Sequence, residues 1–303
     1  MPLQSSGPIS ISEIKTELGS SSNSLRNLSS LAGFSTPDSM SEFYGFAAST
    51  NSHYLSFDRG DALKKSSFVP PINLSSTQDM SISMWVKQGA TQANVQNQIL
   101  FDMSANNSTT TDRFFLQYDR NGNRFVLRMR TNSQNFTINY EIENNNSSMG
   151  LGTNTSTYWS NTNRGATNSD GWSLLTVTYD ASQSTPANAF KFYWNNNLVT
   201  TGSGAAAGSR TSRGVKYITL GNNNHNPTTT AGGYHGLMDE VKIYTSVLTS
   251  AQVNTIWNAG VIENAENTHD TLLFTEFTFD TDTSDSTGFY PIVDNNTATR
   301  TAH

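Results

Sequence analysis

Apolar residues near the N-terminus recur at the spacing of short helices. The sequence SISEIKTELG (10–19) begins with capping serines and ends in glycine, which predicts one helix, and leucines three residues apart predict a second over 25–31. Thr36 and Pro37 precede a further predicted helical turn over 38–43. Because helices this short are marginal in water, we expect them to dock on their own chain or on a neighbouring subunit. The residues expected to make this contact are Ile11, Ile14, Leu18, Leu28, Leu31, Phe34, Phe43 and Tyr44.

From residue 51 onward the apolar positions alternate, as they do in half-buried strands. The sequence SISMWV (81–86) places isoleucine, methionine and valine on one face, opposite two serines and a tryptophan. Asn121 and Gly122 stand between two such strands and form the strongest short hairpin signal. The tripeptide Arg-Gly-Asp at 59–61 has the letters of an integrin ligand, but we interpret it as the turn after the first strand. About ten to twelve short strands with polar turns predict an antiparallel sandwich or jelly roll.

Two later segments break this pattern. The segment 249–260 returns to helical spacing, with Val253, Ile256 and Trp257 on one stripe, and we expect this helix to cover one end of the sandwich. The segment 272–279 returns to strand spacing and predicts an added edge strand or an arm to a partner. The chain therefore divides into an N-terminal assembly segment (1–50), a jelly roll (51–262) and a C-terminal strand or arm (263–303).

Composition narrows the class of protein. Hydrophobic residues make up 35% of the chain, charged residues only 14%, and Asn, Ser and Thr dominate the polar positions. The formal net charge of −6 disfavours nucleic acid, which requires a basic face. No apolar stretch is long enough to predict a membrane span, and the first 30 residues lack the basic and apolar regions of a signal peptide. The absence of cysteine excludes disulfides and thiolate chemistry.

Six segments of the chain resemble those of a known fold family. The last segment is the most specific, because in it a Gly-x-x-Asp-Glu-Val strand runs into a short helix. The six segments are HYLSFDRGDALK (53–64), DMSISMWVK (79–87), GWSLLTVTYD (171–180), FKFYWNNNLV (190–199), YITLGN (217–222) and GLMDEVKIYTSVLTSAQVNTIWNAG (236–260). Together they resemble the concanavalin A-like, laminin-G-like jelly roll. The resemblance implies a mainly β, two-sheet antiparallel sandwich, here with a short helical N-terminal segment and one capping helix. Members of the family bind carbohydrate or protein ligands, some bind calcium, and others hydrolyse glycosides.

A second resemblance is confined to the N-terminus. The sequences MPLQSSGPISISEIKTELG (1–19) and LSSLAGFSTPDSMSEFYGF (28–46) resemble the leader of many tailed-bacteriophage virion proteins, including head and tail appendages. This resemblance implies an assembly segment that binds other virion subunits. Short helices that need a partner surface agree with that role.

The residues disfavour an enzyme. Glycosidases of this superfamily carry acids in a Glu-x-Asp-x-x-Glu pattern, and strand alternation then places two carboxylates on one face. No such pattern is present, and the nearest pair, Glu141 and Glu143, has no third acid. The five histidines are scattered, and no Gly-x-Ser-x-Gly nucleophile turn accompanies them.

Three aspartates are candidates for a calcium site. Alternation places Asp239 on the core face with Val241 and Ile243, where a carboxylate needs a compensating partner. Two interpretations stay open for Asp239: hydrogen bonds from nearby loop amides, or Ca²⁺. Asp280 and Asp282 supply closely spaced oxygen ligands that suit Ca²⁺, but the turn glycine of a calcium loop is missing, so a solvated acidic turn is the alternative.

The long polar segment 144–171 is the main candidate for glycan binding, because loops of this length in compact domains are usually functional or disordered. Tyr158 and Trp159 lie in it among amide and hydroxyl groups, and aromatic faces stack on sugar rings while amides bond the hydroxyls. Trp159 has two other interpretations, a staple that folds back into the core and a contact with a neighbouring subunit. A second, weaker glycan-binding candidate comprises Asn222, Asn223, Asn224 and His225 together with Tyr234 and His235.

These observations predict a non-enzymatic phage virion structural protein: a capsid decoration, head-fibre or tail-appendage protein located at the virion surface. Residues 1–50 would bind other virion subunits, and the jelly roll would bind host-surface polysaccharide. Appendage geometry, rather than any residue, favours a homo-oligomer, with a trimer as the expected state. The alternatives are a secreted carbohydrate-binding module, for which no signal peptide is predicted, and a glycoside hydrolase, for which the acid pair is missing.

Overall fold

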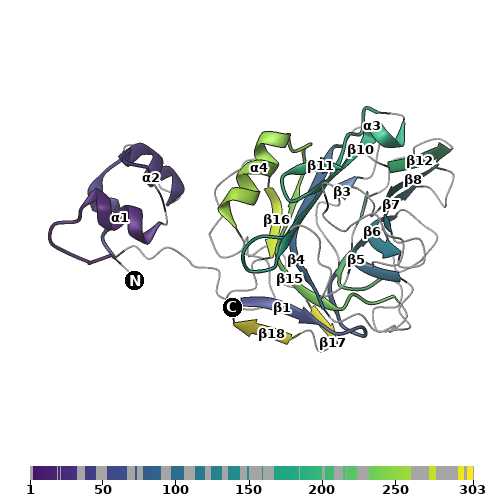
Figure 1. The fold of residues 1–303 in the computed structure, drawn as a ribbon, viewed down its shortest axis with the longest axis horizontal. Coiled ribbons are helices and arrows are strands. Elements are labelled where there is room, and N and C mark those ends of the chain that lie inside the picture. The colour runs from purple at the N-terminus through teal and green to yellow at the C-terminus, as the bar shows by residue number, and fades with distance from the viewer. Residues whose placement is uncertain are drawn as a thin grey trace.

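The computed structural model consists of a small helical unit and a β-sandwich (Figure 1). No helix among the residues it describes is both long and apolar enough to cross a membrane. It describes residues 3–302 except for 19, 21, 33–37, 46–52, 67–71, 74–77, 90–96, 106–112, 120–123, 132–135, 144–148, 150–158, 160–166, 184, 200–201, 208–213, 216, 224–231, 261–272, 278–292 and 297–298.

The helical unit contains α1 (Ile11–Glu17), α2 (Leu25–Leu31) and a 3-10 helix, η1 (Met40–Phe43). Helix α1 begins where Ser10 and Glu13 form a capping box, in which each side chain accepts a hydrogen bond from the other residue's backbone N–H. The two helices and the additional turn were all predicted from the spacing of apolar residues, and all three are confirmed.

These helices dock on one another through a small apolar cluster. Ile14, Leu28 and Phe43 are fully buried in it, and Ile11 and Leu18 pack against it. The unit therefore has a core of its own, separate from that of the sandwich. Of the remaining residues predicted for assembly, Tyr44 is exposed and donates a hydrogen bond to the carbonyl oxygen of Gly7 (2.6 Å), whereas the side chain of Leu31 and all of Phe34 lie outside the described residues.

The sandwich is built from two antiparallel sheets, as predicted. The first has the strand order β11-β10-β9-β4-β15-β1-β18, with β16 also paired to β15. We call it the front sheet. Its strands are β1 (His53–Phe57), β4 (Met80–Gln88), β9 (Ser173–Tyr179), β10 (Phe190–Trp194), β11 (Asn197–Val199), β15 (Gly236–Tyr244), β16 (Leu273–Phe277) and β18 (Thr299–Ala302).

The second sheet, which we call the back sheet, has the strand order β12-β8-β7-β6-β5-β14-β2-β17. A two-stranded pair, β3 (Ile72–Asn73) with β13 (Gly214–Val215), and a short helix, α3 (Pro186–Ala189), complete the connections. The described residues thus form more strands than we predicted. The back strands are β2 (Ala62–Ser66), β5 (Asn97–Ser104), β6 (Arg113–Asp119), β7 (Arg124–Thr131), β8 (Phe136–Glu143), β12 (Gly202–Ala207), β14 (Tyr217–Leu220) and β17 (Val293–Asn296).

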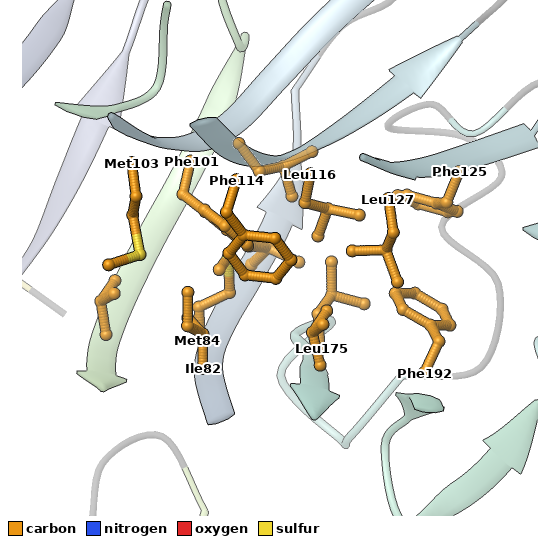
Figure 2. Close-up of a cluster of buried hydrophobic side chains, with 14 of the residues drawn as sticks. Ile82, Met84, Phe101, Met103, Phe114, Leu116, Phe125, Leu127, Leu175 and Phe192 are labelled. Atoms are coloured by element: carbon orange, nitrogen blue, oxygen red, sulfur yellow. The ribbon is translucent and has the colours of Figure 1, made fainter. Parts of the chain in front are cut away.

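The main core lies between the two sheets (Figure 2). Ile82 and Met84 of β4 face it, as the alternation in SISMWV predicted. The predicted hairpin is also confirmed, because β6 and β7 pair from Asp119 with Arg124 onward. The back-sheet side chains in Figure 2 are Phe101, Met103, Phe114, Leu116, Phe125 and Leu127.

A second apolar cluster covers the outer face of the front sheet. Helix α4 (Ser250–Ala259) follows the capping residue Thr249 and packs Val253 and Ile256 onto this face. Trp85 of β4 lies beneath it. We predicted the helix correctly but expected it at one end of the sandwich. It instead covers a sheet face, because that face is itself apolar.

Asp239 does not lie on the core face, and this corrects our prediction. The register between β15 and β4 shifts between Asp239 and Lys242, and Glu240 there has a positive φ of 46°. This bulge reverses the alternation, so Asp239 pairs with Trp85 on the outer face while Val241 remains in the core. Asp239 is buried there, and its Oδ1 accepts a hydrogen bond from the backbone N–H of Glu240 (2.9 Å).

The described residues of the C-terminal segment 263–303 contribute two strands to the front sheet and one to the back sheet. Strand β18 pairs with β1 in the front sheet, and β17 pairs with β2 in the back sheet. Strand β16, which we predicted as an edge strand or an arm, pairs with β15 of the same chain. The pairing of His53 with Ala302 places the C-terminus beside the start of β1. The opposite end of β1 leads into the site described next.

Candidate functional site

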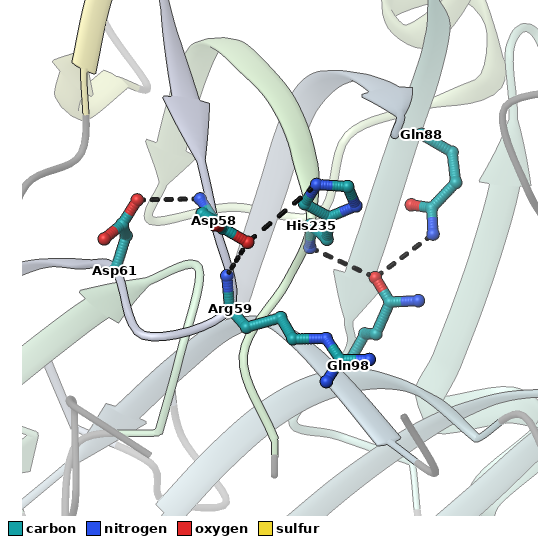
Figure 3. Close-up of polar contacts among 6 residues, drawn as sticks. All are labelled: Asp58, Arg59, Asp61, Gln88, Gln98 and His235. Carbon is teal, nitrogen blue, oxygen red and sulfur yellow. Dashed lines mark hydrogen bonds and ion pairs between the residues drawn. The ribbon is translucent and has the colours of Figure 1, made fainter. Parts of the chain in front are cut away.

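Polar side chains converge at one end of the sandwich, where β1, β4, β5 and β15 begin or end. We call these residues the polar cluster, and Figure 3 shows their contacts. The turn between β1 and β2 supplies three of them, β4 and β5 supply one glutamine each, and the residue before β15 supplies a histidine. The polar cluster consists of Asp58, Arg59, Asp61, Gln88, Gln98 and His235.

The two aspartates hold the β1–β2 turn in shape. Asp61 Oδ2 accepts a hydrogen bond from the backbone N–H of Asp58 (2.7 Å), and Asp58 Oδ1 accepts one from the backbone N–H of Arg59 (2.9 Å). The side chain of Asp58 is 76% exposed, whereas Asp61 is buried. The tripeptide at 59–61 is therefore a turn, as we interpreted it from the sequence.

Gln98 connects the strand ends. Its Oε1 accepts hydrogen bonds from Nε2 of Gln88 (3.1 Å) and from the backbone N–H of His235 (3.2 Å), and both glutamines are buried. The imidazole Nε2 of His235 lies 3.9 Å from Oδ1 of Asp58. A buried amide network thus positions an imidazole next to an exposed carboxylate.

Close backbone contacts fix the polar cluster in place. A Cβ atom on Gly233 would lie 1.6 Å from the carbonyl oxygen of Arg59, so only glycine fits there. The same carbonyl accepts a hydrogen bond from Nδ2 of Asn222 (3.2 Å). Gly89 donates its backbone N–H to the carbonyl oxygen of His235 (3.0 Å). The β1–β2 turn is therefore held against the β14–β15 connection.

The guanidinium group of Arg59 is the unusual part of the polar cluster. Arg59 is partly exposed as a residue, but its Nε and Nη2 atoms are buried and have no hydrogen-bond partner. Within the described part of the chain, no ion pair involves this guanidinium. Two strong donors are thus directed into the protein without an acceptor.

Three residues predicted for glycan binding come together next to the polar cluster, but in a buried layer. The rings of Trp159 and Tyr234 stack with centroids 6.1 Å apart, and both side chains are almost fully buried in the main core. Asn222 is also buried. This corrects the predicted sugar-stacking role of Trp159, because protein covers its ring. Trp159 instead acts as the core staple that we had kept as an alternative. Tyr158 and Asn224 lie outside the described residues.

Tyr234 supports the site from below. Its hydroxyl group lies within hydrogen-bond distance of the carbonyl oxygens of Lys87 (3.2 Å) and Leu237 (3.1 Å), and its backbone N–H donates to Gly221 (2.6 Å). These contacts tie β4 to the β14–β15 connection. Tyr234 and Asn222 thus both hold backbone carbonyl groups next to the polar cluster.

The calcium prediction remains open. Asp280 and Asp282 lie outside the described residues. Across the residues that are described, no group of three or more His, Cys, Asp or Glu side chains is arranged to hold a metal ion. Calcium binding through the acidic segment therefore stays a prediction.

The sequence did not point to Gln88, Gln98 or Arg59 as site residues. The two glutamines each stand at a strand end and carry no motif, and their contact depends on how two sheets meet. His235 belonged to the weaker glycan-binding candidate through its neighbour Tyr234. These residues share one feature in the sequence, namely a polar side chain at the end of an apolar strand. That feature indicates a site only when it is known which strand ends meet in the fold.

Comparison with known families agrees with this geometry. The family described as the concanavalin A-like lectin/glucanases superfamily matches residues 60–254, which is more than half of the chain. The chain belongs to this family. A search of curated proteins finds no match.

Solved structures with a similar fold have low sequence identity. One is a Bacteroides ovatus protein thought to bind carbohydrate, with a TM-score of 0.47 and 13% identity, covering 83% of this chain and 60% of that one. The CBM40 of a Ruminococcus gnavus sialidase gives a TM-score of 0.36 at 13% identity and covers 60% of this chain and 83% of that one. A heptameric pentraxin from Limulus polyphemus gives a TM-score of 0.40 at 10% identity, and the match covers 82% of this chain and 96% of that one.

Proposed function

We propose that this protein is a non-enzymatic carbohydrate-binding protein whose sandwich binds polysaccharide at the polar cluster. The observation that carries this proposal is the convergence of two amides, two carboxylates, an imidazole and a guanidinium at one end of a concanavalin A-like sandwich. Sugar hydroxyl groups donate and accept hydrogen bonds, and these side chains offer both kinds of partner. The exposed carboxylate of Asp58 provides the accessible part of this surface.

The arrangement of the two carboxylates supports binding over hydrolysis. Glycosidases need two acids that flank the scissile bond, one of them free to transfer a proton. Asp61 is buried and accepts a hydrogen bond within the turn, so it is held as a structural group. Asp58 alone is exposed. Binding without bond cleavage therefore fits the polar cluster best.

A glycan array probed with the full chain, followed by titration calorimetry on the polysaccharides that bind, tests this proposal. The double variant Asp58→Ala/His235→Ala removes the two side chains that meet at 3.9 Å, and we expect at least about a tenfold loss of affinity. Lys191→Ala, at an exposed position of β10, is the control and is expected to bind normally. The proposal fails if no polysaccharide binds, or if the double variant binds as tightly as the control and the unaltered chain.

We also propose that the protein is a structural component of a tailed-phage virion, with residues 1–50 as its attachment to other subunits. Two observations support this finer assignment. The helical unit has its own buried cluster, and it lies apart from the sandwich (Figure 1). The polar cluster lies at the end of β1 opposite to the segment that leads from the helical unit. Attachment through the helices would leave the polar cluster facing outward.

Immunogold labelling of purified virions with an antibody against the sandwich tests the virion assignment. Label over the head would support a decoration or head-fibre protein, and label at the tail would support an adhesin. A chain that lacks residues 1–50 should no longer join the virion but should still bind polysaccharide. Absence of label would overturn the virion assignment and favour a secreted carbohydrate-binding module. Analytical ultracentrifugation of the full chain tests the expected homo-oligomer, for which a trimer remains the proposal.

A further inference from the structure

The guanidinium of Arg59 differs from those of the other arginines whose side chains are described. Nε of Arg113 donates to Oδ1 of Asp102 and its Nη2 donates to Oδ2, both at 2.7 Å. These two nitrogens form the edge of a guanidinium that matches a carboxylate side-on. In Arg59 the same two nitrogens are buried and lack any acceptor. Among the described residues, Arg26 also pairs with Asp38 and Arg124 with Asp119, each at 3.2 Å.

The acidic residues nearest in sequence are not available to Arg59. Oδ2 of Asp61 accepts the backbone N–H of Asp58, and Oδ1 of Asp58 accepts the backbone N–H of Arg59 itself. The turn thus uses its own carboxylates to hold its backbone. A buried cationic edge without an acceptor carries a desolvation cost that an anionic partner would offset.

We propose that Arg59 binds the carboxylate of an acidic saccharide, so that the polar cluster selects polysaccharides that contain uronic acids or related sugar acids. This inference rests on the proposed carbohydrate-binding function and specifies its substrate class. A sugar acid presents a planar carboxylate, which the Nε and Nη2 edge binds with two charge-assisted hydrogen bonds.

The rest of the polar cluster complements the other groups of such a ligand. Oε1 of Gln88 is buried and has no hydrogen-bond partner, so it is an acceptor that a sugar hydroxyl group can satisfy. A ligand that satisfies both groups would present an anionic acceptor to Arg59 and a hydroxyl donor to Gln88. A sugar acid carries a carboxylate and hydroxyl groups on one ring.

A contact with a ligand would require the Arg59 side chain to turn outward from its buried position. No hydrogen bond or ion pair holds its guanidinium among the described residues, and the residue is partly exposed. Its backbone, in contrast, is fixed through the carbonyl oxygen that contacts Asn222 and faces Gly233. Turning outward would therefore break no hydrogen bond or ion pair among the described residues, and a bidentate contact with a carboxylate would satisfy the two nitrogens.

The experiment compares acidic polysaccharides with their carboxyl-reduced forms, in which each uronic acid becomes the corresponding neutral sugar. Polyglucuronate, polygalacturonate and alginate are tested in both forms by titration calorimetry with the full chain. We expect at least one acidic polymer to bind about tenfold or more tightly than its reduced form. Arg59→Gln should remove this preference, and Arg59→Lys, which keeps the charge but lacks the planar edge, should retain only part of it.

Arg26→Gln is the matched control, because Arg26 is an exposed arginine in the helical unit, and this variant should keep the full preference. Thermal melting of each variant separates loss of binding from loss of folding. Equal binding of acidic and reduced polymers by the unaltered chain would overturn the inference but leave the proposed function in place. A preference that persists in Arg59→Gln would overturn the role of Arg59. Failure to bind any acidic or neutral polysaccharide, on the array or by calorimetry, would overturn the proposed function itself.

Discussion

Trp257 of helix α4 stacks on Trp85 of strand β4, with ring centroids 5.2 Å apart and 21° between the ring planes. Trp85 is almost fully buried, and it belongs to the apolar cluster on the outer face of the front sheet. The stack therefore attaches the helix to the centre of this sheet rather than to its margin.

Replacing Trp257 with alanine should release this attachment. Because the side chain is partly buried and stacked, we expect Trp257→Ala to lower the free energy of unfolding by about 2–3 kcal/mol. Urea denaturation followed by intrinsic fluorescence or circular dichroism measures the change. Asn258→Ala, at the adjacent exposed position, should remain within about 0.5 kcal/mol of the unaltered chain. Equal losses in both variants would contradict a specific role of the stack.

The ion pair between Arg113 and Asp102 gives a second prediction. Both side chains are buried, and the guanidinium also lies 4.3 Å from the centre of the Phe115 ring. Arg113→Gln removes the cation that pairs with this buried carboxylate and should cost about 3–5 kcal/mol of unfolding free energy. The double variant Arg113→Met/Asp102→Leu should cost less than this single change, because it removes the pair as a whole. A double variant less stable than Arg113→Gln would show that the pair itself contributes net stability.

Gly233 should tolerate no side chain. A Cβ atom there would overlap the carbonyl oxygen of Arg59, and the atoms in its way are all backbone atoms of Arg59, which cannot rotate aside as a side chain could. We expect Gly233→Ala to cost more than about 2 kcal/mol and to abolish polysaccharide binding by displacing the β1–β2 turn. Gly260→Ala is the comparison: its φ is 83° but its surroundings are open, so a cost of about 1 kcal/mol without loss of binding is expected. Calorimetry of unfolding and of binding measures both effects.

The helical unit should respond to acid through Glu13. Hydrogen bonds from the Ser10 side chain and backbone lower the pKa of this carboxyl group. A lowered pKa in the folded state means that the capping contribution is present above the ordinary carboxyl pKa of about 4 and is lost as the pH falls through the lowered value. Amide chemical shifts in α1 should therefore move toward unfolded values at low pH.

Glu13→Gln keeps the hydrogen-bond acceptor but cannot titrate, so the part of this transition that Glu13 causes should disappear. Glu17→Gln, at the other end of the same helix, should leave it in place. An unchanged transition in Glu13→Gln would mean that another group controls the helix.

Removing the C-terminal tail should expose one edge of each sheet. Truncation after residue 292 removes β17 and β18, which pair with β2 and β1. We expect a lower melting temperature and concentration-dependent association, because unpaired edge strands recruit other chains. Truncation after residue 298 removes only β18 and should give a smaller effect. Size-exclusion chromatography and calorimetry distinguish the two, and a fully monomeric, equally stable truncation would contradict the expectation.

Much of the fold follows from local patterns in the sequence. Alternation in β4 predicted a strand, and the Asn-Gly signal predicted the hairpin of β6 and β7; both are confirmed. A serine cap at the start of α1 was predicted from Ser10 or Ser12, and the structure shows Ser10 as the N-cap. These features depend on neighbours along the chain, so one sequence is sufficient to predict them.

The corrected predictions have a different origin. Asp239 changed faces because a single bulge at Glu240 inverts the alternation, and no residue type marks such a bulge. Trp159 looked like part of a surface loop, because composition does not tell whether an aromatic side chain turns inward. The polar cluster joins Gln98 to a backbone group 137 positions away, and that contact exists only once both sheets have formed.

The position of β1 has a mechanical consequence. The helical unit joins one end of this strand and the polar cluster lies at the other, while β18 pairs with residues 53–56 and β15 pairs with residues 55–57. Tension between a fixed helical unit and a bound polysaccharide would pull β1 parallel to its own axis. The hydrogen bonds to both neighbours would then share the load together in shear, instead of opening one after another as they would in peeling. The antiparallel C-terminal strand thus reinforces the one strand that such tension would load first.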